Sequence, residues 1–163
     1  MRDIWIRQAR TEDADAITAL NTTAFGTPDE ARIVEALATD GDSLYSLVAH
    51  DDRDIVGHIQ FFRIRVDGED VAAGLGPMCV APGRQRCGIG SGLIRFGLSL
   101  MQGADRDPVF VLGHPDYYPR FGFSAASAAA FRAPWSGPAF MALRTRDDGL
   151  QGGELTYPRA FGA

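Results

Sequence analysis

Residues 78–92 constrain the fold of this chain more than any other stretch. They have the pattern of an apolar strand end, a loop rich in glycine and arginine, and the start of a helix. Gly88 and Gly90 allow backbone angles that other residues avoid, and they leave no Cβ in the way of a ligand. Consecutive main-chain amides of such a loop converge on one point, where the following helix adds its positive end. With Arg84 and Arg86 in the same stretch, the pattern predicts an anion site suited to a pyrophosphate.

Two other phosphate-binding motifs fit these residues less well. A Walker loop ends in Gly-Lys followed by Ser or Thr, and all 16 basic residues of this chain are arginine. A dinucleotide-binding loop needs a glycine three places after Gly90, where Leu93 stands. A structural alternative stays open, because glycines at a helix start also let the helix pack closely on a strand.

Size and composition favour one globular domain over residues 1–163. Hydrophobic residues make up 45% of the chain and charged residues 23%. The first residues carry charges where a signal peptide needs an apolar run, and no window is apolar for the length of a membrane span. We therefore expect a cytoplasmic protein that does not bind membranes.

Charge and cysteine content exclude further classes of function. The net charge of −5 and the pI of about 5.1 leave no global basic field, so we expect no nucleic-acid partner. Cys79 and Cys87 are too few for a disulfide framework or a four-ligand zinc site, and no metal is expected. Both are expected to be reduced thiols, one in a strand and one in a loop.

Hydrophobic periodicity and turn residues predict a mixed order of strands and helices. Strands are expected at residues 4–9, 43–50, 54–66, 71–80, 108–112, 139–144 and 154–157. Helices are expected from Thr11 as the capping residue to Phe25, from Pro28 to Ala38, from Gly90 or Ser91 to Met101, and briefly at residues 117–121. This order predicts a mixed sheet with helices on both faces, of the α/β or α+β class.

Several segments together resemble one enzyme family. The run Gln85-x-x-Gly88-x-Gly90 matches the Arg/Gln-x-x-Gly-x-Gly/Ala signature of the GNAT superfamily of N-acetyltransferases. Residues 75–82 look like the strand that precedes this signature. Residues 111–123, and the tail segments 140–143 and 157–161, are similar to the YhbS-like branch of that superfamily.

The resemblance implies a fold and an acyl donor. The fold would be a mostly antiparallel mixed sheet in which two parallel strands, residues 75–80 and 109–113, splay apart around the pantetheine arm of acetyl-CoA. Residues that bind acetyl-CoA would be Met78, Cys79 and Val80 at the pantetheine, with Gln85, Arg86, Cys87, Gly88, Ile89, Gly90 and Ser91 at the pyrophosphate.

The implied function is the transfer of an acetyl group from acetyl-CoA to a primary amine of an unidentified acceptor. A non-catalytic acyl-CoA binding or sensing module is the alternative. Because superfamily members are often dimers, a homodimer is a further expectation.

Tyr118 is the predicted general acid, because it aligns with the segment in which many GNAT enzymes hold a tyrosine near the CoA sulfur. A phenol with a pKa of roughly 10 stays protonated at neutral pH and can donate its proton. Tyr117 takes the role if the alignment is displaced by one residue. The alternative is a tyrosine that only packs in an aromatic cluster with Phe121 and Phe123.

The general base has no comparably clear candidate. His114 follows the apolar strand and titrates near neutrality, but it can equally be a loop histidine that bonds a backbone group. Further candidates are His58, Glu35 and Glu69, and a water chain would also serve. The oxyanion donor is expected to be the amide of Cys79 or Val80.

The acceptor site is the least constrained part of the prediction. Aromatic residues Phe131, Trp135 and Phe140 can wall an apolar pocket, or belong to the core or to a dimer face.

Overall fold

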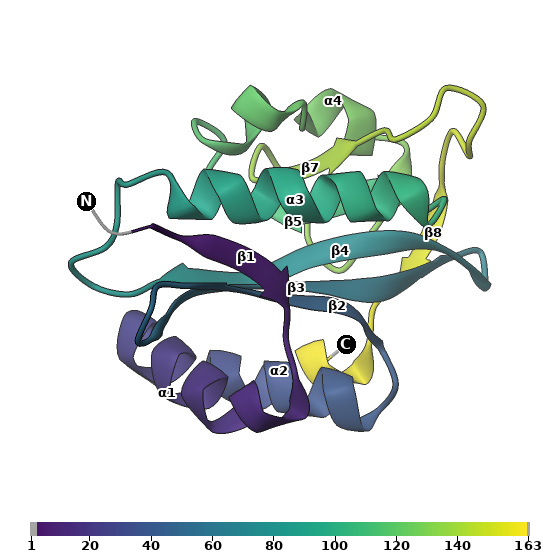
Figure 1. The fold of residues 1–163 in the computed structure, drawn as a ribbon. Helices are drawn as coiled ribbons and strands as arrows, with labels where there is room; N and C mark the ends of the chain where they lie inside the picture. Colours follow the sequence, from purple (N-terminus) through teal and green to yellow (C-terminus); the bar gives the residue numbers. More distant parts are fainter. Residues whose placement is uncertain (1–2, 163) are drawn as a thin grey trace. The chain divides into compact units, whose positions relative to one another are not determined.

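The computed structural model describes residues 3–162 and has the mixed α/β fold expected from the sequence (Figure 1). Its strands follow the order β1-β2-β3-β4-β5-β7, with β8 beside β3 and β6 beside β8. The chain forms two compact units. Unit 1 comprises residues up to Phe61 and Pro77–Gly97, and unit 2 comprises Phe62–Gly76 and the residues from Leu98 on. A single domain over residues 1–163 remains a prediction.

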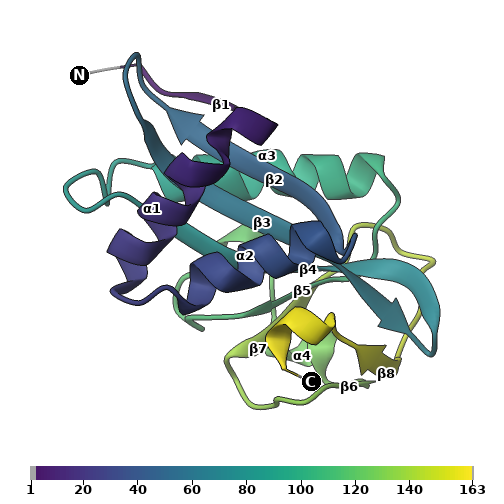
Figure 2. The same ribbon diagram turned by 90° about the horizontal axis from the view of Figure 1, so that it is seen from below.

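Unit 1 contains the N-terminal strands and helices. Its elements are β1 (Trp5–Gln8), α1 (Ala14–Phe25), α2 (Asp29–Thr39), β2 (Ser43–His50), and parts of β3 (Ile55–Val66), β4 (Glu69–Val80) and α3 (Ile89–Gly103). The strands β1 and β2 pair antiparallel. Helices α1 and α2 lie side by side over one face of β2 and β3, and the start of α3 lies on the opposite face (Figures 1 and 2).

The start of α1 differs from the prediction that Thr11 caps it. A 3₁₀ turn, Thr11–Asp13, precedes the helix. Asp13 closes this turn, because its Oδ2 accepts the N–H of Arg10 at 2.7 Å. The helix ends as expected, with Gly26 in the left-handed region at φ 77°.

Close packing of α3 on β3 depends on two glycines. A Cβ at Gly57 would lie 2.9 Å from Cγ2 of Ile89, and a Cβ at Gly97 would lie 2.1 Å from the ring of Phe61. Because real Cβ atoms do not approach this closely, only glycine allows α3 to lie so near the sheet. The first turn of α3 is thereby held firmly at its position.

Unit 2 is built around the central strand β5 (Val109–Leu112). It pairs parallel with β4 through residues 73–75 and antiparallel with β7 (Phe140–Leu143). β8 (Gly153–Thr156) pairs antiparallel with the end of β3 and parallel with the short β6 (Phe131–Arg132). The remaining elements are a 3₁₀ turn at Tyr118–Phe121, α4 (Ala125–Ala128) and a 3₁₀ turn at Arg159–Phe161. The sequence patterns did not predict α4, β6 or the last turn.

Among residues 3–162, no helix is long and apolar enough to cross a membrane. Cys79 is buried in β4 and Cys87 is exposed in the following loop, and both are free thiols as predicted.

Candidate active site

The predicted anion loop lies within unit 1, between β4 and α3. Residues 81–88 leave β4, and α3 begins at Ile89, one residue before the predicted start. Arg86 and Gly88 both adopt left-handed backbone angles, with φ of 65° and 81°. A Cβ at Gly88 would meet no atom within 4 Å. The backbone angle of Gly88 therefore favours glycine, whereas close helix packing does not require one at this position.

The start of α3 presents main-chain donors. Its first hydrogen bond runs from the N–H of Gly92 to the carbonyl of Gly88, at 3.0 Å. The amides of Ile89 and Gly90 therefore precede the helical ladder, at the end where the helix dipole is positive. A loop that turns through two left-handed residues into such a helix end has the geometry that binds phosphate groups.

Side chains of the loop hold it in shape. The Nε2 of Gln85 donates to the carbonyl of Val80 at 3.3 Å, which closes the loop onto the end of β4. The Sγ of Cys87 lies 3.6 Å from the carbonyl of Gln85. Arg86 is exposed. Of the two arginines in the prediction, Arg86 alone has a side chain that extends into solvent.

Arg84 has a structural partner, which corrects the expectation that it is a donor to the anion. Its Nη1 lies 2.9 Å from Oδ2 of the buried Asp51, in the turn between β2 and β3. The Oδ1 of Asp51 accepts the N–H groups of Asp54 at 2.7 Å and Arg53 at 2.8 Å. These amides, followed by the Arg84 guanidinium, hold the pKa of Asp51 well below its usual range.

Met78, Cys79 and Val80 are the last three residues of β4 before the loop. Burial raises the pKa of the Cys79 thiol to about 12, so it stays protonated at neutral pH. Met78 and Val80 are half-buried. The thiol of Cys79 therefore belongs to the core.

Upstream of these residues, the parallel pairing of β4 with β5 is short. The register ends at Leu75 and Val111. Gly76 follows with φ of 142°, and Pro77 has no N–H with which to continue a ladder. The sequence of β4 itself thus ends the pairing at the point where the predicted splay begins.

Tyr118 lies within unit 2, six residues after the end of β5. Its ring is buried and makes edge-to-face contacts with Tyr117 at 5.2 Å and Phe123 at 5.7 Å between centroids. Burial, with a smaller contribution from Tyr117, raises its pKa to about 12. The aromatic cluster named as the alternative does exist, and it also keeps the phenol protonated.

His114 occupies the loop between β5 and Tyr118. Its carbonyl accepts the N–H of Tyr117 at 3.1 Å and that of Tyr118 at 3.3 Å, and its side chain is exposed. The main chain of His114 therefore has a clear role in placing Tyr118.

The contacts of His58 argue against its role as a base. In unit 1, the Nδ2 of Asn21 donates to the carbonyl of Ile17 at 3.0 Å and to His58 Nδ1 at 3.2 Å. His58 Nε2 consequently carries the proton and donates to Ser46 Oγ at 2.8 Å. Burial lowers the pKa of His58 to about 4. Both ring nitrogens are occupied, so this histidine has no lone pair available for a substrate proton.

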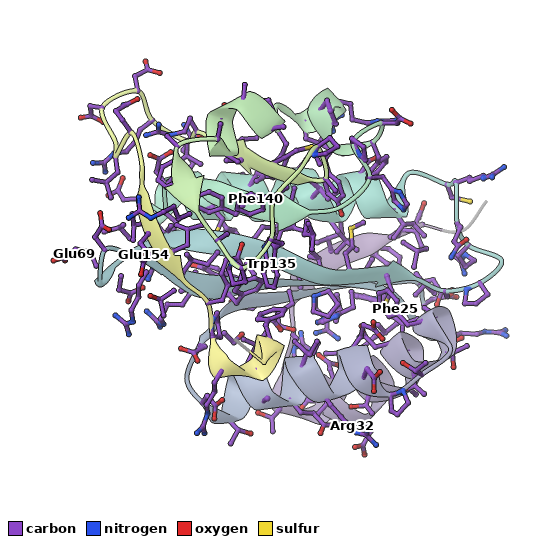
Figure 3. The ribbon with its side chains drawn as sticks, turned by 180° about the vertical axis from the view of Figure 1, so that it is seen from behind. Phe25, Arg32, Glu69, Trp135, Phe140 and Glu154 are labelled. Carbon is purple, nitrogen blue, oxygen red and sulfur yellow. The ribbon has the colours of Figure 1, made fainter. Side chains whose placement is uncertain are left out.

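The two glutamates considered as general bases, Glu35 and Glu69, lie on α2 and at the start of β4. Glu35 on α2 accepts a hydrogen bond from Oγ1 of Thr18 on α1, at 3.1 Å. Glu69 is exposed at the hairpin end of β4, near Glu154 (Figure 3), and at the opposite end of that strand from the loop.

The aromatic residues considered for the acceptor site separate into two groups. Phe131 and Phe140 are buried and pack against Phe110 at 5.1 and 5.6 Å between ring centroids, so they belong to the core. Trp135 is half-buried in the segment between β6 and β7 (Figure 3), with its ring edge-to-face against Tyr157 at 4.7 Å.

Sequence comparison identifies relatives over most of the chain. The family model described as an acetyltransferase (GNAT) domain matches residues 5–126. The uncharacterized N-acetyltransferase YhbS of Escherichia coli K12 is 35% identical over 155 residues, which cover 91% of this chain and 93% of YhbS. The chain belongs to the GNAT family of acetyltransferases. A second E. coli K12 relative, the uncharacterized N-acetyltransferase YjhQ, is 38% identical over 77% of this chain and 73% of its own.

Solved GNAT structures agree with this assignment. The crystal structure of E. coli YhbS in complex with CoA matches 100% of this chain and 94% of its own, with a TM-score of 0.91 and 30% identity. A GNAT acetyltransferase of Brucella melitensis, crystallised with acetyl-CoA, matches 99% of both chains with a TM-score of 0.83 and 34% identity. The predicted GNAT fold is therefore confirmed.

Asp51 is the residue of this GNAT chain that sequence reasoning missed. An aspartate at the first position of a polar turn is a familiar signal for capping of that turn. No local pattern indicated its ion pair with Arg84, which lies 33 positions away.

Proposed function

We propose that this protein transfers the acetyl group of acetyl-CoA to a primary amine. Main-chain amides from Gln85 to Ser91 bind the pyrophosphate, with the exposed Arg86 as an additional cation. The main chain of Met78, Cys79 and Val80 contacts the pantetheine arm. Tyr118 is the general acid.

One observation carries this proposal. Arg86 and Gly88 turn the chain through left-handed angles into the N-terminus of α3, in a chain that matches CoA and acetyl-CoA complexes of GNAT proteins along nearly its full length. The loop fits a diphosphate because its donors are main-chain amides at a positive helix end and its conformation leaves open space at Gly88.

The chemistry divides between the acyl donor and the residues of this chain. Acetyl-CoA supplies a thioester, and the neutral amine adds to its carbonyl carbon to give a tetrahedral intermediate. Collapse of this intermediate breaks the carbon–sulfur bond. An amide of Cys79 or Val80 stabilises the negative charge that develops on the carbonyl oxygen. Tyr118 then gives its hydroxyl proton to the departing sulfur, and a phenol with a raised pKa holds that proton at neutral pH. Water or His114 takes the proton that the amine loses, and the Tyr118 phenolate regains a proton from solvent before the next turnover.

Two measurements test the proposal in sequence. Calorimetric titration with acetyl-CoA measures binding, and a panel of primary amines then measures CoA release that depends on the acceptor. Saturable binding and acceptor-dependent release are expected. A melting temperature and heat signal that do not respond to saturating acetyl-CoA would refute the assignment of the loop.

A non-catalytic acyl-CoA binding module is the second candidate. The two hydrogen-bonded ring nitrogens of His58 favour it, because they remove this histidine from the set of general bases. Tight binding of acetyl-CoA without release of CoA, across amines of different charge and size, would establish this alternative.

A further inference from the structure

Gly113 lies directly against the ring of Tyr118. A Cβ built on Gly113 would lie 2.4 Å from Cε2 of that ring, 2.9 Å from Cδ2 and 3.4 Å from Cζ. Real Cβ atoms do not approach other atoms closer than about 3 Å, and an aromatic ring cannot bend away as a flexible chain end can. Only glycine at position 113 is compatible with this placement of the tyrosine.

Gly113 cannot easily move away from the ring. It follows the last residue of β5, and its N–H donates to the carbonyl of Ala139 at 2.9 Å. The preceding residue, Leu112, pairs with Phe140 of β7 in the antiparallel ladder. The backbone on this side of Tyr118 is therefore held by the sheet.

Two further aromatic rings pack on Tyr118. Phe123 is buried with 1% of its surface exposed, and it packs edge-to-face on Tyr118. Tyr117 packs on the ring in the same manner, and the Tyr118 N–H is bonded to the carbonyl of His114. If a Cβ at position 113 pushed on the Tyr118 ring, the ring would have to tilt or displace these neighbours. The Tyr118 hydroxyl would then move with the ring.

We propose that Gly113 is a positioning residue of the acetyl transfer, which holds the Tyr118 hydroxyl where it donates its proton. This inference rests on the proposed function, because it assigns Gly113 a role only through Tyr118. A shift of about 1 Å in a reacting group can reduce a rate by two orders of magnitude. To accommodate a Cβ at position 113, the Tyr118 ring has to move by a distance on the order of 1 Å.

Gly113→Ala tests this role in steady-state kinetics. We expect kcat to fall about 10- to 100-fold, with the KM for acetyl-CoA within about twofold of its original value. In a Tyr118→Phe background the same substitution should cause no further loss, because the hydroxyl that it misplaces is already absent. Gly103→Ala is the matched control, since a Cβ at this helical glycine meets nothing within 4 Å.

The outcomes separate the positioning role from the proposed function. If Tyr118→Phe lowers kcat while Gly113→Ala keeps the wild-type kcat, the positioning role of Gly113 is wrong and the assignment of Tyr118 as general acid stands. If Tyr118→Phe keeps full turnover, the acid is wrong, and Gly113 has no role through it. Equal losses from Gly113→Ala in both backgrounds would indicate a general structural effect and would overturn the inference.

A second variant covers the case in which Gly113→Ala does not fold. Phe123→Leu removes an aromatic ring that packs edge-to-face on Tyr118, and the same loss in kcat with an unchanged KM is expected. The loss should again disappear in the Tyr118→Phe background, and its persistence there would contradict the positioning role.

Discussion

The Nη1 of Arg84 lies 2.9 Å from the Oδ2 of Asp51, so the first arginine of the loop between β4 and α3 forms an ion pair with a buried carboxylate. Asp51 also caps its own turn between β2 and β3. The ion pair therefore connects the start of the loop to the turn between β2 and β3. If the loop binds acetyl-CoA as proposed, Arg84 contributes to binding through the shape of the loop.

Asp51→Asn should loosen this connection. The amide oxygen of asparagine can still accept the N–H groups of the turn, so the substitution chiefly removes the charge opposite Arg84. We expect a loss of about 1–3 kcal/mol in the free energy of unfolding and a several-fold weaker affinity for acetyl-CoA, measured by urea denaturation and calorimetry. Asp52→Asn, at the exposed neighbouring position, is the control. Unchanged values in Asp51→Asn would show that the pair does not shape the loop.

Tyr118→Phe should separate catalysis from binding. It removes the proposed acid and keeps the ring that packs on Phe123. We expect kcat to fall about 100-fold or more, with the dissociation constant of acetyl-CoA nearly unchanged, in a CoA-release assay combined with calorimetry. Tyr117→Phe tests the alternative alignment. Full turnover in Tyr118→Phe would remove the general-acid assignment.

Gly88→Ala should weaken acetyl-CoA binding through its backbone angle. At φ of 81° an alanine is strained by about 1 kcal/mol or more, and relief of that strain moves the adjacent amides. We expect about a tenfold rise in the dissociation constant by calorimetry. Gly41→Ala is a matched control, because Gly41 has φ of 76° and equally open surroundings at the end of α2. Equal affinities of the two variants for acetyl-CoA would show that the loop conformation at Gly88 does not contribute to acetyl-CoA binding.

His58 predicts a pH dependence of stability. Burial lowers its pKa to about 4 in the folded chain, from an ordinary value of 6.5. Between these values the unfolded chain binds more protons, so stability rises with pH and is lost as the pH falls from about 6.5 toward 4. We expect wild-type protein to lose about 2–3 kcal/mol of unfolding free energy between pH 7.5 and pH 4.5 in urea titrations.

His58→Gln should remove most of this dependence. Burial-opposing hydrogen bonds and ion pairs lower the pKa values of the carboxylates Asp13, Asp51, Asp70 and Asp107 from their ordinary value of 3.8, so these groups contribute chiefly below pH 4 and are largely separated from this window. An unchanged slope in the variant would mean that another group titrates there.

The two cysteines should differ sharply in reactivity. Cys87 is exposed in the loop, whereas Cys79 is buried with its pKa raised to about 12. We expect one thiol of the native protein to react with a disulfide reagent, and acetyl-CoA to slow that reaction. Cys87→Ser should abolish it. Rapid reaction of a second native thiol would contradict the burial of Cys79.

Local patterns predicted most of the longer elements to within about two residues, because periodicity and turn residues act over short distances along the chain. The loop was predicted from Gln85, Gly88 and Gly90 for the same reason. The short elements α4 and β6 escaped prediction, because four and two residues are too few to display a period.

The sequence by itself determined the order of the longer strands and helices, the glycine-rich turn at Gly88, and the family to which the chain belongs. Only the tertiary structure decided that Arg84 pairs with Asp51 and that Tyr118 lies against Gly113. It also decided that Asn21 and Ser46 form hydrogen bonds with the two ring nitrogens of His58. These relationships join side chains from separate elements. Their geometry follows from how strands and helices pack, which a one-dimensional pattern does not encode.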